Sequence, residues 1–471
     1  MSGIFGVISK DNCQQLLFYG TDYHSHLGTQ FAGLAVWSQN ELLRKIHDIK
    51  GSQFKAKFHE DYKIMKGAMG IGVISAIDEQ PICVHSKFGS FAVVTNGFIE
   101  NADSLAAELY KEGQSFSEVT DGKVNQSELV AKLIIKGNSI AEGIEHMFSK
   151  IKGACSLLLL NTEGIYAARD RYGYSPLIIG QKDKDWAVTT ENSAFLNLGF
   201  KVVKEIQPGE IVLLNKEGLK QRSSVSKDKG VCQICSFLWV YTGFPASSYE
   251  GVNVEMARER CGCCLAKGDD VKADMVSGIP DSGTAHAIGY AMCSDIPLRR
   301  PLVKYTPGYD RSYTPAAQEM RDLIAKMKLI PVPDIIDGKS IVFCDDSIVR
   351  GTQLKNYTIQ KLRECGAKEI HMRIACPPLM FPCKFNYSTR SLNELAARKA
   401  IKAIEGREIE DISPYLDENS SQYKKMVDWI TKDIGVTTLK FQKLEDMVKA
   451  LGLPKDKLCH YCWTGESKKG A

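Results

Sequence analysis

The fold of the C-terminal half of the chain is set by the stretch Val342-Phe343-Cys344-Asp345-Asp346-Ser347-Ile348-Val349-Arg350-Gly351-Thr352. An apolar strand, predicted from Ser340 to Cys344, runs into two consecutive aspartates and then into a glycine-containing loop. The pattern then predicts a helix from Gln353 to Glu364 and another strand from Glu369 to Ile374. Strand, loop, helix and strand in this order form a βαβ unit, which implies a parallel sheet.

A second loop of similar character comes earlier in the chain. A mostly apolar strand from Met275 to Ile279 runs into Pro280-Asp281-Ser282-Gly283-Thr284, and a helix follows through Ala291. Ligands of parallel sheets bind at the carboxyl ends of the strands, so we expect both loops to form one site. Taken alone, the second loop is equally compatible with a phosphate contact and with a simple turn.

The two aspartates, Asp345 and Asp346, carry the chemistry of the first loop. Loop amides and the positive end of a helix suit a phosphate group. Neighbouring acids suit ribose hydroxyls or Mg²⁺, which prefers oxygen ligands. The alternative is an acidic strand end followed by an ordinary helix cap. Two carboxylates that end a buried strand repel each other, which favours a compensating ligand.

The rest of the chain predicts a second domain of a different class. The 471 residues suit two domains. The first part combines short strands and turns with helical periodicity at 127–135 and 140–148, which is typical of an α+β domain. A polar, lysine-rich stretch from Lys216 to Lys229 is the expected boundary. The predicted domains are therefore 1–228 and 229–471.

Composition excludes several classes of protein. An apolar content of 44% with 25% charged residues is that of a soluble globular chain, and a net charge of +4 gives no case for nucleic acid or a membrane surface. The N-terminus lacks the pattern of a secretion signal, so a cytoplasmic location is predicted. The 15 cysteines are then expected to be buried thiols or metal ligands, not disulfides.

Two Cys-x-x-Cys pairs stand out among these cysteines. Cys232 and Cys235 open the second domain, and Cys459 and Cys462 lie near the C-terminus. The pattern alone indicates a four-cysteine zinc site or an iron–sulfur cluster. By contrast, Cys261-Gly262-Cys263-Cys264 is expected to pack within a helix.

The loop from Asp345 to Thr352 resembles the signature with which type I phosphoribosyltransferases bind phosphoribosyl pyrophosphate (PRPP), in the form found in the glutamine PRPP amidotransferase family. The resemblance covers nearly the whole chain. Its N-terminal landmarks are Gly3-Ile4-Phe5-Gly6-Val7, His26-Leu27-Gly28, Ala32-Gly33, Met69-Gly70-Ile71-Gly72, Thr95-Asn96-Gly97 and Gly173-Tyr174-Ser175-Pro176-Leu177. It implies an α+β N-terminal-nucleophile-hydrolase-like domain with layered antiparallel sheets, followed by an α/β phosphoribosyltransferase domain with a parallel sheet.

The resemblance also implies the residues of a PRPP site. Asp345 and Asp346 would hold the ribose diol, and with Ser282 they would bind Mg²⁺. The backbone of Ser347, Ile348, Val349, Arg350, Gly351 and Thr352 would cradle the 5-phosphate, and Asp281, Ser282, Gly283 and Thr284 would approach the pyrophosphate. Lys304 and Arg311, with Lys326 and Lys328, would act from a loop that closes over PRPP; a solvated basic face is the alternative. The usual sequence of that loop in the family is absent here.

The N-terminal half departs from the family at its glutaminase site. The family uses an N-terminal cysteine, and this chain has Ser2. The arginine that grips the glutamine carboxylate falls at Ser75, and the aspartate that pairs with its amine falls at Gln126. Each lost charged contact is worth about 1.5–3 kcal/mol. Asn96 and Gly97, the family's oxyanion-hole residues, remain, although Asn-Gly is also a good turn dipeptide.

Many members of the family carry a [4Fe–4S] cluster, and the matching ligand positions are Cys235, Cys383, Cys459 and Cys462, all present. Zinc and inert thiols remain the alternatives.

The implied reaction is displacement of pyrophosphate from PRPP by ammonia, which gives 5-phosphoribosylamine in the first step of purine synthesis. Because the glutaminase residues are lost, the ammonia would come from solution or a partner. The alternatives are a glutamine-dependent enzyme that uses Ser2, and a non-catalytic PRPP- or nucleotide-sensing relative. Family resemblance further implies purine nucleotides as inhibitors and a homodimer or homotetramer.

Overall fold

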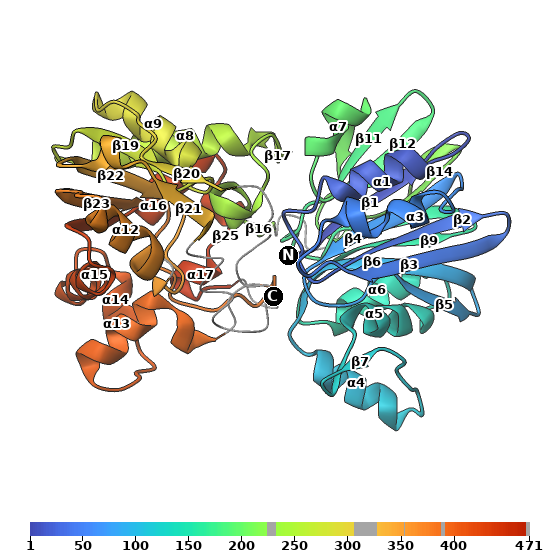
Figure 1. Ribbon diagram of the computed structural model, residues 1–471. Coiled ribbons are helices and arrows are strands. Elements are labelled where there is room, and N and C mark those ends of the chain that lie inside the picture. The colour runs from blue at the N-terminus through green and yellow to red at the C-terminus, as the bar shows by residue number, and fades with distance from the viewer. Residues whose placement is uncertain (224–231, 306–326, 353, 388–390, 468–471) are drawn as a thin grey trace.

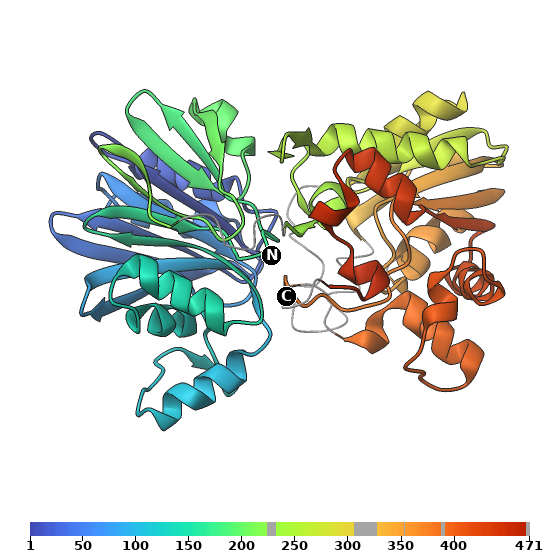
Figure 2. The same ribbon diagram turned by 180° about the vertical axis from the view of Figure 1, so that it is seen from behind.

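The computed structural model describes residues 1–223, 232–305, 327–352, 354–387 and 391–467. Two halves of the chain lie side by side, and the N-terminus lies at the junction between them (Figure 1). The view from behind shows the same division (Figure 2). The predicted boundary at residue 228 falls outside the described residues.

Two antiparallel sheets form the N-terminal half. One sheet has seven strands, in the order β13 (Lys201–Glu205), β11 (Ile178–Lys182), β12 (Asp185–Thr189), β1 (Gly3–Ile8), β4 (Met69–Ser75), β2 (Phe31–Ser38) and β3 (Glu41–Asp48). The other has six, in the order β15 (Gly218–Gln221), β14 (Ile211–Asn215), β10 (Gly164–Ala168), β9 (Gly153–Asn161), β6 (Gly89–Ile99) and β5 (Ile82–Ser86). Strand β15 lies inside the polar stretch that was taken as the domain boundary.

The two sheets pack face to face, with helices on their outer sides. One buried cluster joins Ile4 and Val73 of the first sheet to Val94 and Leu158 of the second. A second cluster packs α1 (Gln14–Asp22) against the seven-stranded sheet. A third packs α4 (Ala102–Lys111), α5 (Gln126–Ile135) and α6 (Ile140–Lys150) against the six-stranded sheet. This layered arrangement confirms the predicted α+β architecture.

A parallel sheet forms the core of the second half. Its order is β19 (Met275–Gly278), β22 (Ser340–Asp345), β23 (Glu369–Ile374) and β24 (Thr438–Phe441), and every neighbouring pair is parallel. The strands predicted at 275–279, 340–344 and 369–374 are therefore confirmed. The surrounding helices include α8 (Val254–Lys267), α9 (Thr284–Ser294), α13 (Ala396–Glu405), α15 (Ser421–Ile434) and α16 (Leu444–Leu451).

The helix predicted from Gln353 to Glu364 differs in its first turns. A π-helical turn, η2 (Leu354–Ile359), comes first, and α12 (Gln360–Glu364) continues it. Hydrophobic periodicity locates a helix but does not distinguish α from π hydrogen bonding, so the pattern does not predict this turn. Such turns are frequent at functional sites. Among the described residues, no helix has the length and apolar character needed to cross a membrane.

One expectation about the cysteines is wrong. Cys263 of α8 and Cys293 of α9 form a disulfide, although both were expected to be reduced. The two helices pack against each other and place the Cα atoms of these residues 5.2 Å apart, within the range of a disulfide. Helical patterning alone did not predict which faces of the two helices would meet.

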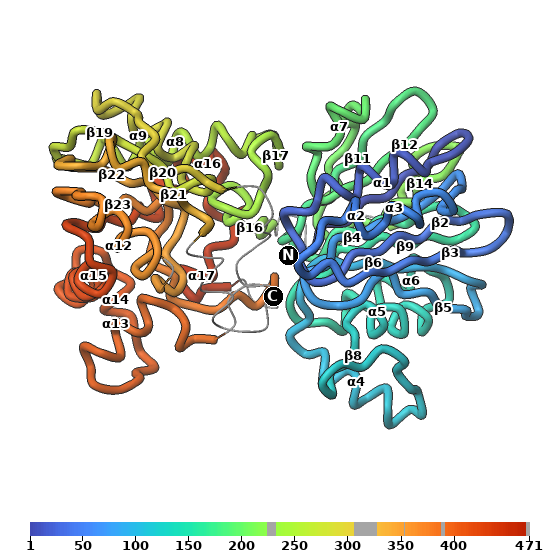
Figure 3. The backbone as a smooth tube through the Cα atoms, viewed as in Figure 1, coloured from blue at the N-terminus to red at the C-terminus, as the bar shows by residue number. Residues whose placement is uncertain are grey.

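Short elements connect the second half to the junction. Strand β16 (Ile234–Cys235) pairs in parallel with β25 (Leu458–Cys459), which precedes α17 (Tyr461–Thr464). Figure 3 shows β16 and α17 near the N-terminus. Across the junction the ring of Tyr174 stacks on that of Phe385, with centroids 3.9 Å apart. The junction is therefore packed with side chains from both halves.

Candidate functional site

The two loops predicted to form one site do meet. Because β19 and β22 are parallel neighbours, their carboxyl ends lie at the same edge of the sheet. The Oγ atom of Ser282, from the loop after β19, donates a hydrogen bond to Oδ1 of Asp345, at the end of β22, over 2.6 Å. A hydrogen bond between these two side chains places both loops around one site.

Gly283 explains how closely the loops approach. A Cβ atom at this position would lie 2.0 Å from the carbonyl oxygen of Cys344, the residue before the acid pair. Real Cβ atoms do not approach an oxygen that closely, so a side chain at position 283 would push the second loop away from β22. The glycine is needed for the close approach of the backbone.

The acid pair is buried and electrostatically unfavourable. Asp345 is 9% exposed and Asp346 is 6% exposed. Burial raises the pKa of Asp345 well above its usual range, and the neighbouring charge of Asp346 raises it further. Burial also raises the pKa of Asp346, while a hydrogen bond from the hydroxyl of Ser347 opposes that effect. The groups around the acid pair therefore offset its burial only in part.

Of the four predicted cations, Lys304 and Lys328 are described. Lys304 ends β20 (Leu302–Lys304), and its ammonium lies 2.5 Å from Oδ2 of Asp281 in the second loop. Strand β20 pairs with β21 (Leu329–Pro331), so Lys328 is brought to the same hairpin. Arg311 and Lys326 lie outside the described residues.

The remaining predicted residues of the first loop are Ser347, Ile348, Val349, Arg350, Gly351 and Thr352, directly between β22 and η2. The guanidinium of Arg350 forms an exposed ion pair with Glu394, at 2.9 Å. Gly351 has φ of +75°, in the region that favours glycine. The backbone of this loop is therefore the part available to a ligand, and the side chain of Arg350 is engaged elsewhere.

In the N-terminal half, Ser2 and Asn96 are in contact. The backbone N–H of Ser2 donates to Oδ1 of Asn96 over 3.0 Å, and Oγ of Ser2 accepts the N–H of Ala76 over 3.1 Å. Asn96 is 1% exposed, and among the described residues its Nδ2 has no hydrogen-bond partner. Gly97 has φ of +138°. These neighbours make a small polar site around Ser2.

Ser75 and Gln126 are neutral and already bonded. The Oγ of Ser75 accepts a hydrogen bond from Nε2 of Gln80, and Oε1 of Gln126 accepts the N–H of Ile99 over 2.9 Å. Sequence reasoning missed Asp78, whose Oδ2 accepts the N–H of Gln126 over 3.0 Å. Burial raises the pKa of Asp78 to about 6. Nothing in its sequence surroundings marks this residue.

The four cysteines at 235, 383, 459 and 462 converge at the junction. Cys235 and Cys459 are partners across the β16–β25 pair. The ionisation of each of the four thiols is influenced by at least one of the others, and that of Cys462 by all three. A hydrogen bond with Cys462 lowers the pKa of Cys383 to about 7, whereas burial raises that of Cys235 to about 12.

Two observations bear on the zinc alternative. Cys232, the other member of the first Cys-x-x-Cys pair, lies near Arg169 and Glu250 instead. Within the described ranges, no group of three or more potential ligands is arranged to hold a single metal ion. The convergence of the four thiols therefore does not take the form of a preformed single-ion site.

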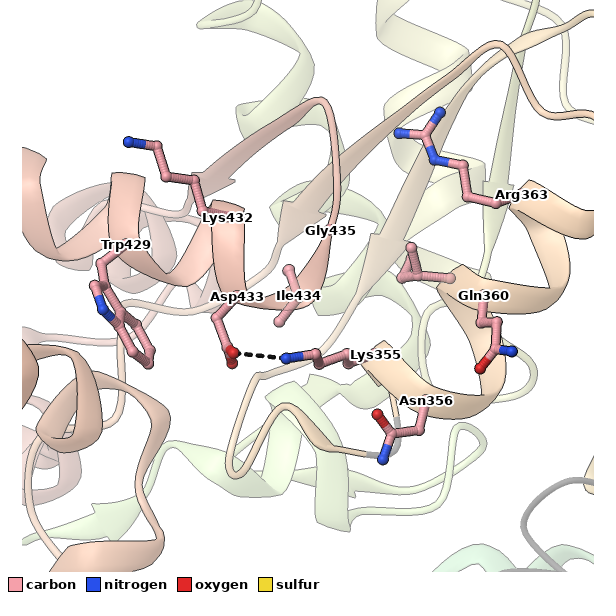
Figure 4. Close-up of a pocket in the computed structure, with 10 residues that line it drawn as sticks. Lys355, Asn356, Gln360, Arg363, Trp429, Lys432, Asp433, Ile434 and Gly435 are labelled. Carbon is pink, nitrogen blue, oxygen red and sulfur yellow. Dashed lines mark hydrogen bonds and ion pairs between the residues drawn. The ribbon is translucent and has the colours of Figure 1, made fainter.

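A cavity of about 780 Å³ lies beside the first loop and was not predicted. It is bounded by η2, α12 and the end of α15, and Figure 4 shows Lys355 directed toward Asp433, with which it pairs at 2.8 Å. None of the predicted site residues lines it. The cavity is therefore distinct from the site formed by the two loops.

Comparison with known proteins agrees with this geometry. A family model described as a glutamine amidotransferase domain matches residues 68–197. An amidophosphoribosyltransferase of Methanocaldococcus jannaschii is 32% identical, over 99% of this chain and 97% of that protein. The Bacillus subtilis amidophosphoribosyltransferase is 30% identical, over 98% and 93%.

Solved structures extend the likeness to the fold. The glutamine PRPP amidotransferase of B. subtilis, complexed with ADP and GMP, superposes with a TM-score of 0.84 and 30% identity, over 99% of this chain and 97% of that one. A structure described as the allosteric regulatory enzyme of purine biosynthesis gives the same TM-score. With the two loops joined at one edge of a parallel sheet, this chain belongs to the amidophosphoribosyltransferase family and is an enzyme of the pentosyltransferase type.

Proposed function

We propose that the chain forms 5-phosphoribosylamine and pyrophosphate from PRPP and ammonia, in purine synthesis, without using glutamine. The observation that carries the PRPP site is the 2.6 Å hydrogen bond between Ser282 and Asp345, which joins the two loops. The names of the relatives support the reaction class. The first line of support concerns the second half of the chain alone, whereas the relatives match nearly all of it.

The acid pair fits a bound Mg²⁺. Burial raises the pKa of both carboxylates, so a bound cation would stabilise their ionised forms, and oxygen ligands are those that Mg²⁺ prefers. Asp345, Asp346 and Ser282 would hold the ion. When bound, it would neutralise charge that develops on the leaving pyrophosphate.

The residues of the chain would do the rest of the work. Backbone amides from Ser347 to Thr352 would hold the 5-phosphate. Carboxylate oxygens of the acid pair would accept hydrogen bonds from the ribose hydroxyls. Lys304 would exchange its bond with Asp281 for one with pyrophosphate. The bond from C1 of the ribose to the pyrophosphate oxygen breaks, a bond from C1 to the ammonia nitrogen forms, and that nitrogen loses a proton to solvent.

The source of nitrogen rests on the N-terminal half. Ser2 is a weaker nucleophile than a cysteine near neutral pH, and Ser75 and Gln126 offer no charge to a glutamine substrate. The test measures pyrophosphate release from PRPP and Mg²⁺ with either ammonium or glutamine. We expect release with ammonium only. Glutamate formation from glutamine at the rate of pyrophosphate release would refute the proposal, and PRPP binding without release would indicate a sensor.

One observation favours the alternative that glutamine is used through Ser2. The buried Nδ2 of Asn96 has no partner among the described residues, although its Oδ1 bonds the backbone of Ser2. An unpaired buried donor beside a hydroxyl is the arrangement that stabilises an oxyanion. Replacing Ser2 by alanine distinguishes the ammonia-dependent from the glutamine-dependent reaction, since it would abolish only the latter.

We also propose that Cys235, Cys383, Cys459 and Cys462 bind a [4Fe–4S] cluster. The mutual influence of all four thiols supports this, and the lowered pKa of Cys383 favours the thiolate that metals bind. When bound, the cluster would join β16, β25 and the segment around Cys383. Iron and acid-labile sulfide in the purified protein test this proposal, and stoichiometric zinc without iron would contradict it.

Several further parts complete the proposal. The B. subtilis structure contains ADP and GMP, so we propose purine nucleotides as inhibitors. We propose a homodimer or homotetramer in the cytoplasm, and a division into domains 1–228 and 229–471. Inhibition assays test the nucleotides, light scattering tests the oligomeric state, and limited proteolysis tests the domain division.

A further inference from the structure

Arg258 of α8 is a buried cation to which the proposed reaction gives no role. It is 6% exposed. Its Nε donates to the carbonyl of Trp239 over 2.8 Å, and its Nη2 donates to those of Tyr241 and Gly243 over 2.9 and 2.8 Å. All three acceptors are neutral, so they satisfy the donors of the guanidinium without neutralising its charge. Burying a charge without neutralising it costs free energy, which indicates that Arg258 has a role in the protein.

The three carbonyls belong to one turn. They are carbonyls of the π-helical turn η1 (Leu238–Thr242) and of Gly243, the residue that follows it. His286 of α9 lies on the same turn, with Nε2 3.3 Å from the carbonyl of Val240 and Nδ1 3.1 Å from that of Arg258. Burial lowers the pKa of His286 to about 4, so the ring is neutral near pH 7 and donates to one of the two carbonyls.

The turn also connects the second half to the first. Immediately after it, the N–H of Phe244 donates to Oε1 of Glu191 over 3.1 Å, and the hydroxyl of Tyr249 donates to the same oxygen over 2.6 Å. Glu191 belongs to the N-terminal half and is 1% exposed. Its other carboxylate oxygen lies 2.9 Å from Nε2 of His26. A buried carboxylate of one half therefore holds the end of a turn in the other.

Arg258 is also connected to the second loop of the site, through α9. Helix α9, which carries His286, begins at Thr284, where the second loop ends. Burial lowers the pKa of Arg258, and the negative charge of Asp346 is the strongest influence that opposes this. Arg258 in turn favours the ionised form of Asp346. His286 therefore joins Arg258 and the turn to the helix that follows the second loop.

We propose that Arg258 is a positioning residue for the PRPP site: by fixing residues 238–243, it links Glu191 of the N-terminal half to α9 and the second of the two loops proposed to bind PRPP. The inference rests on the proposed binding of PRPP at those loops. It gives the N-terminal half a purpose that needs no glutamine chemistry, since contact through Glu191 shapes the site in the other half.

Arg258→Gln tests this in the full-length protein, with Arg260→Gln as the matched control. Arg260 is two residues further along α8, and its Nε donates to the carbonyl of Ala450, on α16, over 2.6 Å. Calorimetry gives the dissociation constant of PRPP in the presence of Mg²⁺, and thermal melting reports stability. We expect Arg258→Gln to weaken PRPP binding at least about tenfold, and Arg260→Gln to change it less than about twofold.

Two further variants separate positioning from a general loss of structure. Arg258→Lys keeps the charge but not the three-way hydrogen bonding, so it should restore only part of the affinity. Glu191→Gln, in the other half, should also weaken PRPP binding. Combined with Arg258→Gln, it should cost less than the product of the two single effects, because both act through the same turn.

The outcomes are distinct. Absence of PRPP binding by the unchanged protein would overturn the proposed function itself. Normal binding by that protein, with Arg258→Gln and Arg260→Gln equal in affinity, would overturn the inference alone, as would a lower melting temperature with an unchanged dissociation constant. If Arg258→Gln does not fold, Arg258→Lys decides the matter: PRPP affinity equal to that of the unchanged protein overturns the inference.

Discussion

Replacing Asp345 by asparagine should weaken PRPP binding without weakening the fold. Oδ1 of Asp345 already accepts two hydrogen bonds, from Oγ of Ser282 over 2.6 Å and from the N–H of Asp346 over 2.9 Å. An asparagine oxygen can accept both. The second carboxylate oxygen, which we propose binds the ribose, is the one that is lost. One charge-assisted hydrogen bond is worth about 1.5–3 kcal/mol, which is roughly a 10- to 150-fold loss of affinity.

Stability should change in the opposite direction. Burial and the charge of Asp346 raise the pKa of Asp345 in the folded protein. An acid whose pKa is raised by folding supports the fold when protonated, and that support is lost as the pH rises through the folded pKa. At pH 8 the asparagine variant should therefore melt at or above the temperature of the unchanged protein, and the difference should shrink toward pH 4.

Calorimetry with PRPP and Mg²⁺, together with melting at both pH values, checks this prediction. Asp428→Asn is the control, because Asp428 is exposed on α15 in the same half. Equal PRPP affinity in Asp345→Asn and Asp428→Asn would refute the assignment of the acid pair to the ribose. A clear drop in melting temperature at pH 8 would refute the electrostatic reasoning.

Three other changes have defined outcomes. Gly283→Ala places a methyl group 2.0 Å from the carbonyl oxygen of Cys344 and should cost roughly 1–3 kcal/mol in unfolding free energy as well as most PRPP binding, measured by denaturation and calorimetry. Ser2→Ala should leave ammonium-dependent pyrophosphate release unchanged, and a loss of more than half the rate would contradict the proposal that Ser2 takes no part in the reaction. Burial raises the pKa of Asp78 to about 6, so protonated Asp78 stabilises the fold below that pH and this stabilisation is lost as the pH rises through 6. Asp78→Asn should therefore raise the melting temperature at pH 8 more than at pH 5.

The sequence predicted the second half well because its signals are local. The strands at Met275, Ser340 and Glu369 are short apolar runs that end in loops rich in small and polar residues, and each was found where it was expected. The meeting of Ser282 and Asp345 follows from one topological rule, that parallel neighbours end at the same edge. Local pattern and topology were sufficient for this part of the site.

The features that were missed depend on contacts between distant segments. Asp78 meets Gln126 only because two loops converge on the start of α5. The bond between Cys263 and Cys293 depends on which faces of α8 and α9 meet. The role of Arg258 depends on three carbonyls of a turn whose π-helical form leaves no mark in the hydrophobic pattern. Each of these needs the tertiary structure, which periodicity and spacing do not contain.

The pairing of β16 with β25 affects how the second half could be handled as a unit. Its first and last described strands are neighbours, and Cys235 and Cys459 are partners in their pairing. A segment whose two ends lie together can be given new ends elsewhere, or transferred between related proteins, with little rearrangement of its interior. A circularly permuted second half, joined at these two strands and opened elsewhere, should therefore keep its parallel sheet. A chimaeric enzyme whose halves are exchanged at these strands should keep it as well.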